Sequence, residues 1–333
     1  MVGHRRVLGI ESTAHTFGVS VATEEKLLSD VRDVYKAPEG AGIHPLEASR
    51  HHASIAASVV SGAIEEAGVS VADIDAIAYA KGPGLGPCLR VGAVVARTLA
   101  LSIERPLVPV NHAIGHIELG CHLTAAEEPL VLLISGGHTM VIAYSAGMWR
   151  VLGETLDLTL GQLLDQLGRH VGFSSPCGPR IEEAASRSKK YVRLPYTIKG
   201  NDVSYSGLLT AAKRLIDSGV EFEDVAYSVQ ETAFAMTVEV TERALAFTDK
   251  DEMMVVGGVA ANRRLAEMLS LMVVRHAAAF HVVPLKFSGD CGAQIAWTGN
   301  LAFRSGGSVP VAESMIKQSW RLDTVPIPWR SQT

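Results

Sequence analysis

Two histidines one helical turn apart are the first residues in this sequence that could do chemistry. His112 and His116 are separated by four positions, so on a helix both imidazoles lie on one face, a spacing that can hold a metal ion. Two of twelve histidines can also fall four positions apart by chance. The place of the pair strengthens the metal interpretation, because it opens a predicted helix directly after a predicted strand, at the sheet edge where α/β sites gather.

A carboxylate in the second half of the chain completes a candidate ligand set. Asp290 follows a predicted strand, residues 280–283, at the place equivalent to that of His112. Two neutral imidazoles and one carboxylate suit iron or zinc and leave positions open for a substrate, and the sequence does not choose between the two metals. Position 113 is alanine, so the H-E-x-x-H pattern of zinc proteases lacks its glutamate, which disfavours a hydrolase.

Two glycine-rich turns could hold a phosphate group. Residues 135–139 (Ser-Gly-Gly-His-Thr) join two predicted strands, and residues 257–262 (Gly-Gly-Val-Ala-Ala-Asn) lie between a predicted strand and helix. Backbone amides in such turns, and the positive end of a helix dipole, favour anions. The same glycines can instead simply allow close packing, and the sequence leaves both interpretations open.

Two helix predictions include charged residues whose surroundings the sequence does not fix. Asp165 lies among leucines in the predicted helix 155–171, where it is either a buried, paired group or an exposed charge, and spacing alone favours the exposed charge. In the first half, residues 45–67 read as one long amphipathic helix, with Arg50, His51 and His52 on a solvated face.

An internal duplication must position all of these residues. Residues 7–35 and 130–157 share one design: a strand, a turn with a His-Thr pair, a second strand and a third apolar stretch. Residues 75–110 and 253–283 share a second design, in which a strand, a glycine turn, a helix and a strand follow one another, with the helices predicted over residues 89–101 and 260–272. Closely spaced strands pair antiparallel, and strands separated by helices pair parallel. Each half is therefore an α/β unit with a mixed sheet, and two facing halves leave a cleft, a preferred place for a ligand.

Length, composition and charge limit the possible functions. The 333 residues suggest two domains, at about 150 residues each. The four cysteines lie far apart without a C-x-x-C pair, which excludes a zinc ribbon and a disulfide framework and predicts a reducing, cytoplasmic location. No apolar run approaches the roughly 18 residues of a membrane span, so we expect no membrane partner. The net charge of -5 is unlike that of a protein that holds nucleic acid alone.

Seven motifs occur in order between about residue 7 and residue 300. They are Gly9-Ile10-Glu11-Ser12, Gly82-Pro83-Gly84-Leu85, Asn111-His112-x-x-Gly115-His116-Ile117, Ser135-Gly136-Gly137-His138-Thr139, Gly153-Glu154-Thr155-Leu156-Asp157, Gly257-Gly258-Val259-Ala260-Ala261-Asn262 and Asp290-x-Gly292-Ala293-x-Ile295-Ala296. This set resembles the family that makes threonylcarbamoyladenosine in tRNA, whose members were formerly described as O-sialoglycoprotein endopeptidases. The details resemble the archaeal members, which are the catalytic subunit of the KEOPS complex.

The resemblance implies a fold that agrees with the duplication. It is the actin/Hsp70/hexokinase-like α/β fold, with two duplicated ribonuclease-H-like lobes and a cleft between them. On this basis we expect a first lobe over residues 1–125, a second lobe over residues 126–294, and a C-terminal stretch, residues 295–333, that packs back on the first lobe.

The resemblance also implies an activity and its site residues. The activity is transfer of a threonylcarbamoyl group from threonylcarbamoyl-AMP to the exocyclic amine of the adenosine that follows the anticodon. The implied ligands of one divalent ion, iron or zinc, are His112, His116 and Asp290. The residues implied for substrate and nucleotide are Leu133, Ile134, Ser135, Gly136, Gly137, Asp165, Gly178, Glu182 and Asn262. We add Glu11 and His138 as catalytic candidates, with Glu11 acting through cleft electrostatics.

Two departures from the family pattern and two other functions stay open. Leu133 stands where archaeal relatives often carry a metal-ligating tyrosine, and Cys291, beside Asp290, is either an extra soft ligand or, more in keeping with its size, a packing residue. The alternatives to the transferase are a metallo-glycopeptidase and an ATPase, chaperone-like protein or sugar kinase of the same fold that binds ATP or AMP.

The resemblance implies tRNA and two protein partners, a kinase-like KEOPS subunit and a small dimerising subunit that docks on helices of the first lobe. With its net charge of -5, the isolated chain should bind tRNA weakly, because the partners must supply basic surface. Filter binding with tRNA measures this affinity. A tight and salt-resistant complex of tRNA with the isolated chain would contradict the expectation.

Overall fold

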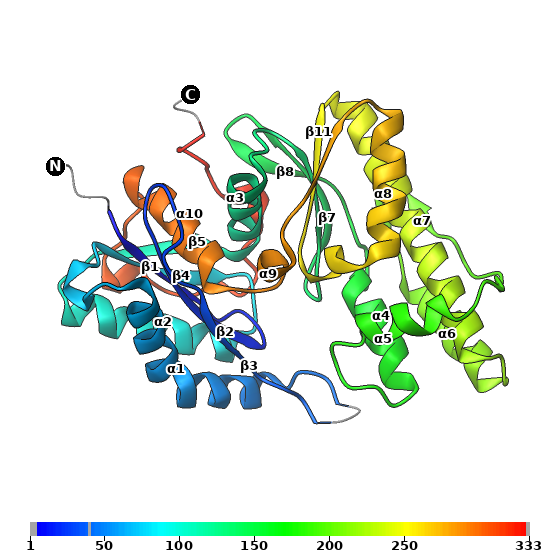
Figure 1. Cartoon of the computed structure of the whole chain (residues 1–333), viewed down its shortest axis with the longest axis horizontal. Coiled ribbons are helices and arrows are strands. Elements are labelled where there is room, and N and C mark those ends of the chain that lie inside the picture. The colour runs from blue at the N-terminus through cyan, green and yellow to red at the C-terminus, as the bar shows by residue number, and fades with distance from the viewer. Residues whose placement is uncertain (1–4, 39–40, 331–333) are drawn as a thin grey trace.

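Two five-stranded sheets of the same design form the framework of the protein (Figure 1). The computed structural model describes residues 5–38 and 41–330, so the outer ends of the expected lobes, residues 1 and 333, lie outside the described residues. The strands of the first sheet are β1 (Val7–Glu11), β2 (Thr16–Ala22), β3 (Val31–Val34), β4 (Ala76–Gly82) and β5 (Leu107–Asn111). Those of the second are β6 (Leu130–Ile134), β7 (Thr139–Ser145), β8 (Met148–Glu154), β11 (Glu252–Val256) and β12 (Ala279–Val282).

The two sheets have equivalent strand orders, as the duplication predicts. The first runs β3-β2-β1-β4-β5 and the second runs β8-β7-β6-β11-β12. In each, three strands form an antiparallel meander and two more extend it in parallel, with β1 paired to β4 and β6 paired to β11. The last strands of the two sheets, β5 and β12, therefore end at equivalent places, and the candidate metal ligands follow them.

Ten α-helices and several shorter elements cover the sheets in the described part of the chain. The α-helices are α1 (Pro45–Ala67), α2 (Gly86–Ser102), α3 (His112–Thr124), α4 (Leu160–His170), α5 (Gly178–Ser186), α6 (Ser206–Asp217), α7 (Phe222–Thr248), α8 (Arg263–Arg275), α9 (Leu285–Ser288) and α10 (Gly292–Arg304). The shorter elements are η1 (Val71–Asp73), η2 (Gly258–Ala261), η3 (Val311–Glu313), η4 (Leu322–Thr324), β9 (Ile198–Lys199) and β10 (Asp202–Val203). No helix within residues 5–38 and 41–330 combines the length and apolar character that crossing a membrane requires.

Two helices begin later than the sequence pattern predicts, and in both cases a capping side chain sets the start. We expected one helix over residues 155–171, but α4 begins at Leu160 because the Thr159 hydroxyl accepts a hydrogen bond from Gln162 N and caps it. The helix expected to begin at Ala260 is interrupted after η2, because the Asn262 side chain accepts from Leu265 N and starts α8.

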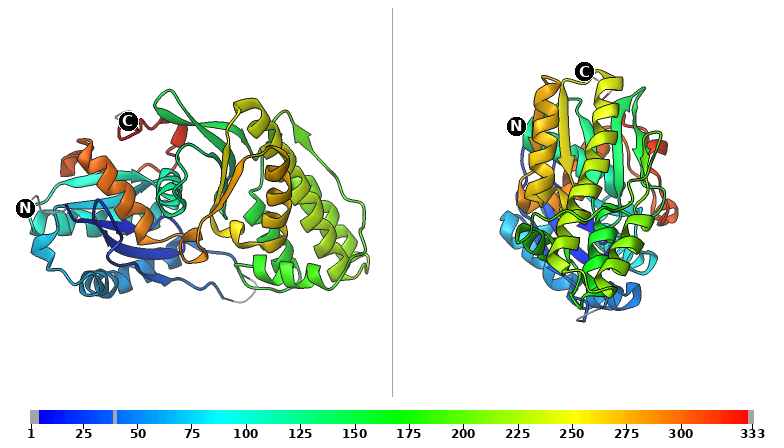
Figure 2. Two further views of the ribbon diagram at one scale, coloured as in Figure 1. Left: turned by 45° about the horizontal axis from the view of Figure 1, so that its top comes forward. Right: turned by 90° about the vertical axis from the view of Figure 1, so that its right-hand side faces the viewer.

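Helix α10 connects the two sheets, since it follows the last strand of the second sheet but packs on the first (Figure 2, left). Its close approach to β1 depends on glycine: a Cβ at Gly9 would lie 2.1 Å from Ala296 N. We call the first sheet with α1, α2, α3 and α10 the first lobe, and the second sheet with α4–α8 the second lobe. The residue boundaries of the expected lobes stay a prediction.

The C-terminal tail, residues 305–330, contacts both lobes. Val309 forms a bridge to Leu107 in the first sheet, and Pro326 forms a bridge to Met148 in the second. The tail was expected on the first lobe; its second half lies against α3 of that lobe and also against β8 of the second, where Ile327 is fully buried.

The prediction that Arg50, His51 and His52 form a solvated face of α1 is wrong for His52. His52 is fully buried and packs against Phe17, with 5.5 Å between ring centroids, and its Nε2 bonds to the Ala14 carbonyl at 3.0 Å. His51 and Arg50 lie at the surface side, where His51 contacts Asp33. His52 lies four, seven and eight residues before the buried Ala56, Val59 and Val60, so the helical spacing places it on the apolar face of α1.

The buried His52 should make stability depend on pH. Burial lowers its pKa to about 4, whereas in the unfolded chain the pKa is about 6.5. The unfolded state therefore binds the extra proton, and His52 reduces stability as the pH falls from about 6.5 to 4, by at most about 1.4 kcal/mol per pH unit. Urea unfolding of the metal-free protein should show a shallower loss in His52→Gln than in the wild type. Equal pH slopes in the two proteins, with His51→Gln as the matched control, would contradict this.

Candidate metal centre

The histidine pair lies at the start of α3 because the preceding residue caps that helix. Asn111 Oδ1 accepts hydrogen bonds from Ala113 N at 3.0 Å and Ile114 N at 3.3 Å. His112 is therefore the first residue of the helix and His116 follows one turn later, with 4.7 Å between their ring centroids. The capped start gives both imidazoles a fixed direction.

Asp290, between α9 and α10, reaches the same place from the second half of the chain. Its Oδ1 lies 3.3 Å from His116 Nε2 and 3.6 Å from His112 Nε2. The ligand atoms of the three residues all lie within 4.8 Å of one another. Their side chains are 6%, 2% and 14% exposed for His112, His116 and Asp290, so only the aspartate side of the group is open.

These three residues fit a transition metal ion. Two imidazole nitrogens and one carboxylate oxygen form a donor set that iron and zinc both accept, with coordination positions left over. The atoms converge from two separate helix starts, so a single ion could be shared among them without moving the backbone.

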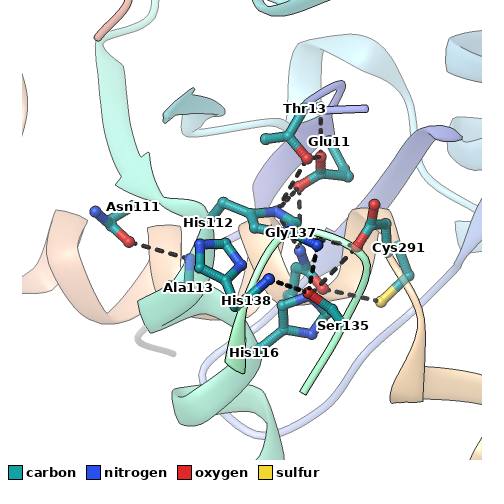
Figure 3. A network of polar contacts seen from close by, with 12 residues as sticks. Glu11, Thr13, Asn111, His112, Ala113, His116, Ser135, Gly137, His138 and Cys291 are labelled. Atoms are coloured by element: carbon teal, nitrogen blue, oxygen red, sulfur yellow. Dashed lines mark hydrogen bonds and ion pairs between the residues drawn. The ribbon is translucent and has the colours of Figure 1, made fainter. Parts of the chain in front are cut away.

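A fourth buried group fixes the orientation of His112. Glu11 is fully buried at the end of β1, and its Oε2 accepts a hydrogen bond from His112 Nδ1 at 2.9 Å (Figure 3). This bond places the proton on Nδ1 and leaves the Nε2 lone pair directed at Asp290, the arrangement found behind metal-binding histidines. Glu11 therefore fits a positioning residue better than a group that touches substrate.

Two residues that the sequence did not single out hold Glu11 in place. Thr13 donates its backbone N–H to Glu11 Oε1 at 2.6 Å, and the Gln294 amide donates to Glu11 Oε2 at 3.1 Å. The turn after β1 thus supports the glutamate. Gln294 lies in the first turn of α10, four residues after Asp290.

The charges of the group favour a cation. Burial alone would lower the pKa of His112, but the Glu11 and Asp290 carboxylates outweigh it and raise this pKa to about 9. Burial lowers the pKa of His116. Burial also disfavours an ionised Asp290, yet the two histidines hold its pKa below the usual range. Without an ion, a proton on His112 balances the carboxylates, and a divalent ion would displace that proton.

His138 extends the group from the second lobe. Its ring stacks on that of His112 with 6.1 Å between centroids. Burial is the main cause that lowers the pKa of His138, and the nearby His112 and His116 lower it further, to about 3. The imidazole is therefore neutral. Its Nδ1 is buried and has no hydrogen-bond partner among the described residues.

The glycine turn that carries His138 is held by its own serine. Ser135 Oγ accepts from Gly137 N at 3.1 Å and from His138 N at 3.0 Å, so these two amides are already used. Gly136 is exposed with open space around it. Leu133 and Ile134, which precede the turn, are fully buried core residues whose side chains reach no open surface.

Hydrogen bonds connect the glycine turn of residues 135–139 to α4, which carries a residue implied for nucleotide binding. Thr159, at the start of α4, donates its hydroxyl to the Gly136 carbonyl at 3.0 Å. Farther along α4, Asp165 Oδ1 accepts from Cys177 N at 2.7 Å, just before Gly178 opens α5. Asp165 is thus a partly buried, paired carboxylate, and the exposed alternative that spacing favoured is wrong.

The second glycine turn lies at the other end of α5. Glu182 Oε1 accepts from Arg263 N at 3.0 Å, at the first residue of α8. Asn262 uses both ends of its amide within the protein, since Oδ1 caps α8 and Nδ2 donates to Gln230 at 3.0 Å. Gly257 (φ 97°) lies against the Ile134 backbone, where a Cβ would come within 2.3 Å, so this glycine serves close packing, whereas Gly258 borders open space.

Cys291 fits a packing residue. It is fully buried, and burial raises the pKa of its thiol, which keeps the proton on sulfur. It stands outside the group of His112, His116 and Asp290 that could share one ion.

Comparison with known proteins now identifies the family. The family model described as tRNA N6-adenosine threonylcarbamoyltransferase matches residues 26–297. A protein of Thermofilum pendens named tRNA N6-adenosine threonylcarbamoyltransferase is 53% identical, over 98% of this chain and 98% of its own length. The chain belongs to the tRNA N6-adenosine threonylcarbamoyltransferase family.

One relative within this family is longer than the chain. The "Probable bifunctional tRNA threonylcarbamoyladenosine biosynthesis protein" of Methanothermobacter thermautotrophicus is 48% identical over 98% of this chain, which spans 61% of that protein.

Solved structures agree on the fold of the threonylcarbamoyltransferase family member. The structure of T.kodakarensis HypF matches with a TM-score of 0.64 at 14% identity, over 91% of this chain and 48% of that chain. At this identity the likeness concerns the fold alone. The fold is the actin/Hsp70/hexokinase-like α/β fold with two duplicated lobes, as expected from the sequence.

Loss of the buried carboxylate should weaken metal binding. In Glu11→Gln the amide no longer balances charge behind His112, and the affinity for zinc should fall about 10- to 100-fold. His116→Ala should lose the site altogether. Competition with a coloured chelator measures both, and His276→Ala, at the exposed end of α8, is the matched control. Wild-type affinity in Glu11→Gln would contradict the positioning role.

Proposed function

We propose that this chain is a tRNA N-threonylcarbamoyltransferase. It transfers the threonylcarbamoyl group from threonylcarbamoyl-AMP to the exocyclic amine of the adenosine on the 3′ side of the anticodon. The observation that supports it most is the convergence of His112, His116 and Asp290, from both halves of the duplication, beside a glycine turn of the second lobe. Membership of the threonylcarbamoyltransferase family gives the reaction class.

The bond changes define what the site must do. The donor is a mixed anhydride of a carbamic acid and a phosphate. The adenosine amine attacks the carbamoyl carbon, a C–N bond forms, and the C–O bond to phosphate breaks. AMP leaves with the electron pair, and the amine loses one proton. The site must therefore orient the carbonyl, accept negative charge on the leaving phosphate and keep water from the anhydride.

His112, His116 and Asp290 would hold one divalent ion, iron or zinc. A bound ion of this kind supplies Lewis acidity to a carbonyl or phosphate oxygen, typically several kcal/mol of stabilisation. Glu11 keeps His112 in the tautomer that the ion needs.

The adenylate would lie along the second lobe, from the metal centre towards α5. Asp165 and Glu182 each have one carboxylate oxygen bound to a backbone N–H, which leaves the other oxygen for a ribose hydroxyl. Gly178 and Gly136 border open space where a ligand can approach the backbone. The neutral His138 imidazole is placed between the glycine turn and His112, and we assign it contact with the reacting group.

The protein partners fit the surface of the first lobe. Val94 and Leu101 on α2 are 55% and 64% exposed, an apolar strip that suits the small dimerising KEOPS subunit. The bifunctional name of the Methanothermobacter relative supports a second protein that works with this chain, for which we propose the kinase-like KEOPS subunit. We place the assembly and its tRNA substrate in the cytoplasm.

Reconstitution tests the proposal. Wild-type protein with the adenylate-forming enzyme, partner subunits and tRNA should yield threonylcarbamoyladenosine, measured by mass spectrometry of digested nucleosides. His116→Ala should lose about 10³-fold or more of the rate, because it removes a metal ligand. His276→Ala should keep the rate.

Three outcomes would refute this function. They are full activity of His116→Ala, clean cleavage of a glycoprotein by metal-loaded protein, or tight ATP binding and turnover with no metal present. The last two would support the glycopeptidase and the ATPase.

A further inference from the structure

A cavity of about 210 Å³ lies where the C-terminal tail crosses α3 and α10, outside the metal centre. Its walls are largely apolar, and two indoles of the tail, Trp320 and Trp329, contribute to them. At roughly 30 Å³ per water molecule, this volume equals about seven waters. The cavity can hold one flat ring system and is too small for a whole nucleotide.

Two buried polar groups of the cavity wall are unpaired. Thr298 on α10 is 2% exposed, and its Oγ1 has no hydrogen-bond partner among the described residues. The same holds for the buried Nε1–H of Trp329 within that part of the chain. Both atoms are also closed off from solvent, so neither is exposed to the open space of the cavity, whose free surface is mainly apolar.

Two lysines stand beside the indole wall. Lys81 Nζ lies 5.7 Å from the centroid of the Trp320 ring. Burial is the main cause that lowers the pKa of Lys81. The like charge of Lys317 lowers this pKa further, whereas the Glu313 carboxylate raises it. Neither Lys81 nor Lys317 forms an ion pair with any residue in 5–38 or 41–330. Two close, unpaired cations next to an aromatic wall attract an anion.

The cavity is joined to the metal centre by a single side chain. Asn111 Nδ2 donates to the Trp320 carbonyl at 3.0 Å, while Asn111 Oδ1 caps α3 immediately before His112. Figure 1 shows the tail, in red, against α3. A ligand in the cavity is therefore held close to the reacting end of α3.

We propose that this cavity binds one nucleobase of the substrate RNA, a neighbour of the modified adenosine in the anticodon loop. The base stacks on the tail indoles, and its phosphate lies outside on Lys81 and Lys317. Aromatic stacking with adjacent cations is how proteins hold single-stranded nucleic acid. A protein side chain would use the apolar walls but not the two lysines. The inference rests on the proposed function, because it takes RNA as the substrate.

Salt dependence tests the lysines. Each phosphate contact in single-stranded RNA contributes about 0.7 to the slope of log affinity against log salt. For the complete complex with tRNA, Lys81→Gln/Lys317→Gln removes the contact with one phosphate and should therefore reduce the slope by about 0.7. Lys189→Gln, an exposed lysine of the second lobe, should leave it unchanged. An unchanged slope in the double variant would overturn the phosphate site.

Substitution of Trp320 tests the base. Trp320→Ala should raise the KM for tRNA about tenfold with little change in kcat, and Trp320→Phe should restore stacking. Single abasic nucleotides through the anticodon loop should include one position that weakens wild type but adds nothing to Trp320→Ala. Absence of such a position would overturn the inference. If Trp320→Ala proves unstable, the inference is overturned when no abasic position weakens both the wild type and Trp320→Phe.

The two hypotheses fail in different ways. A wild-type complex that modifies no tRNA refutes the proposed function itself. A wild type that modifies tRNA, with all cavity variants equal to it, refutes only the nucleobase site. A third outcome is that Trp320→Ala no longer binds the partner subunits while the lysine variant keeps the wild-type salt slope. That outcome would show that the cavity docks protein, and it would also overturn the inference.

Discussion

The contact of α10 with the backbone of β1 is the constraint on which the site depends. Gly9 has no side chain, so Ala296 can lie directly on the strand, and the start of α10 is drawn across from the second sheet to the first. That position brings Asp290 to the histidines of α3 and Gln294 to Glu11. A side chain at position 9 would push the helix away, and the ligand from the second half would leave with it. The metal centre is thus a product of backbone packing as much as of its ligands.

The duplication explains why three ligands can come from two halves without symmetry. After β5, the Asn111 cap starts a long helix at once, and that helix supplies two imidazoles. After β12, the equivalent segment forms only the short α9 and then a turn, which supplies one carboxylate. The electrostatic result is a pair of buried carboxylates, Glu11 and Asp290, on either side of His112. The first lobe supplies both histidines and Glu11, and the segment after β12 supplies Asp290.

The sequence predicted the parts of this structure that depend on periodicity and on spacing within one element. The mixed sheets, the helix of residues 45–67 and the pairing of His112 with His116 all follow from such local patterns. Contacts between distant segments were not predictable in this way. His52 is buried by Phe17, and Asp165 is held by the backbone before Gly178, although neither neighbour is close in sequence. Helix starts were misplaced where a single cap, as at Thr159, decides the boundary.

The tail that bridges Leu107 to Val309 and Met148 to Pro326 ties the two lobes together across their outer side. Lobes of this kind close on a ligand by rotating about their junction. Here such a rotation has to bend the tail, because the tail is attached to one strand of each lobe. Asn111 binds the tail at Trp320 and also caps α3. Rotation of the lobes is therefore coupled to the start of α3. Entry of a bulky polynucleotide between the lobes is therefore limited by the eighteen residues from 309 to 326 rather than by the sheets.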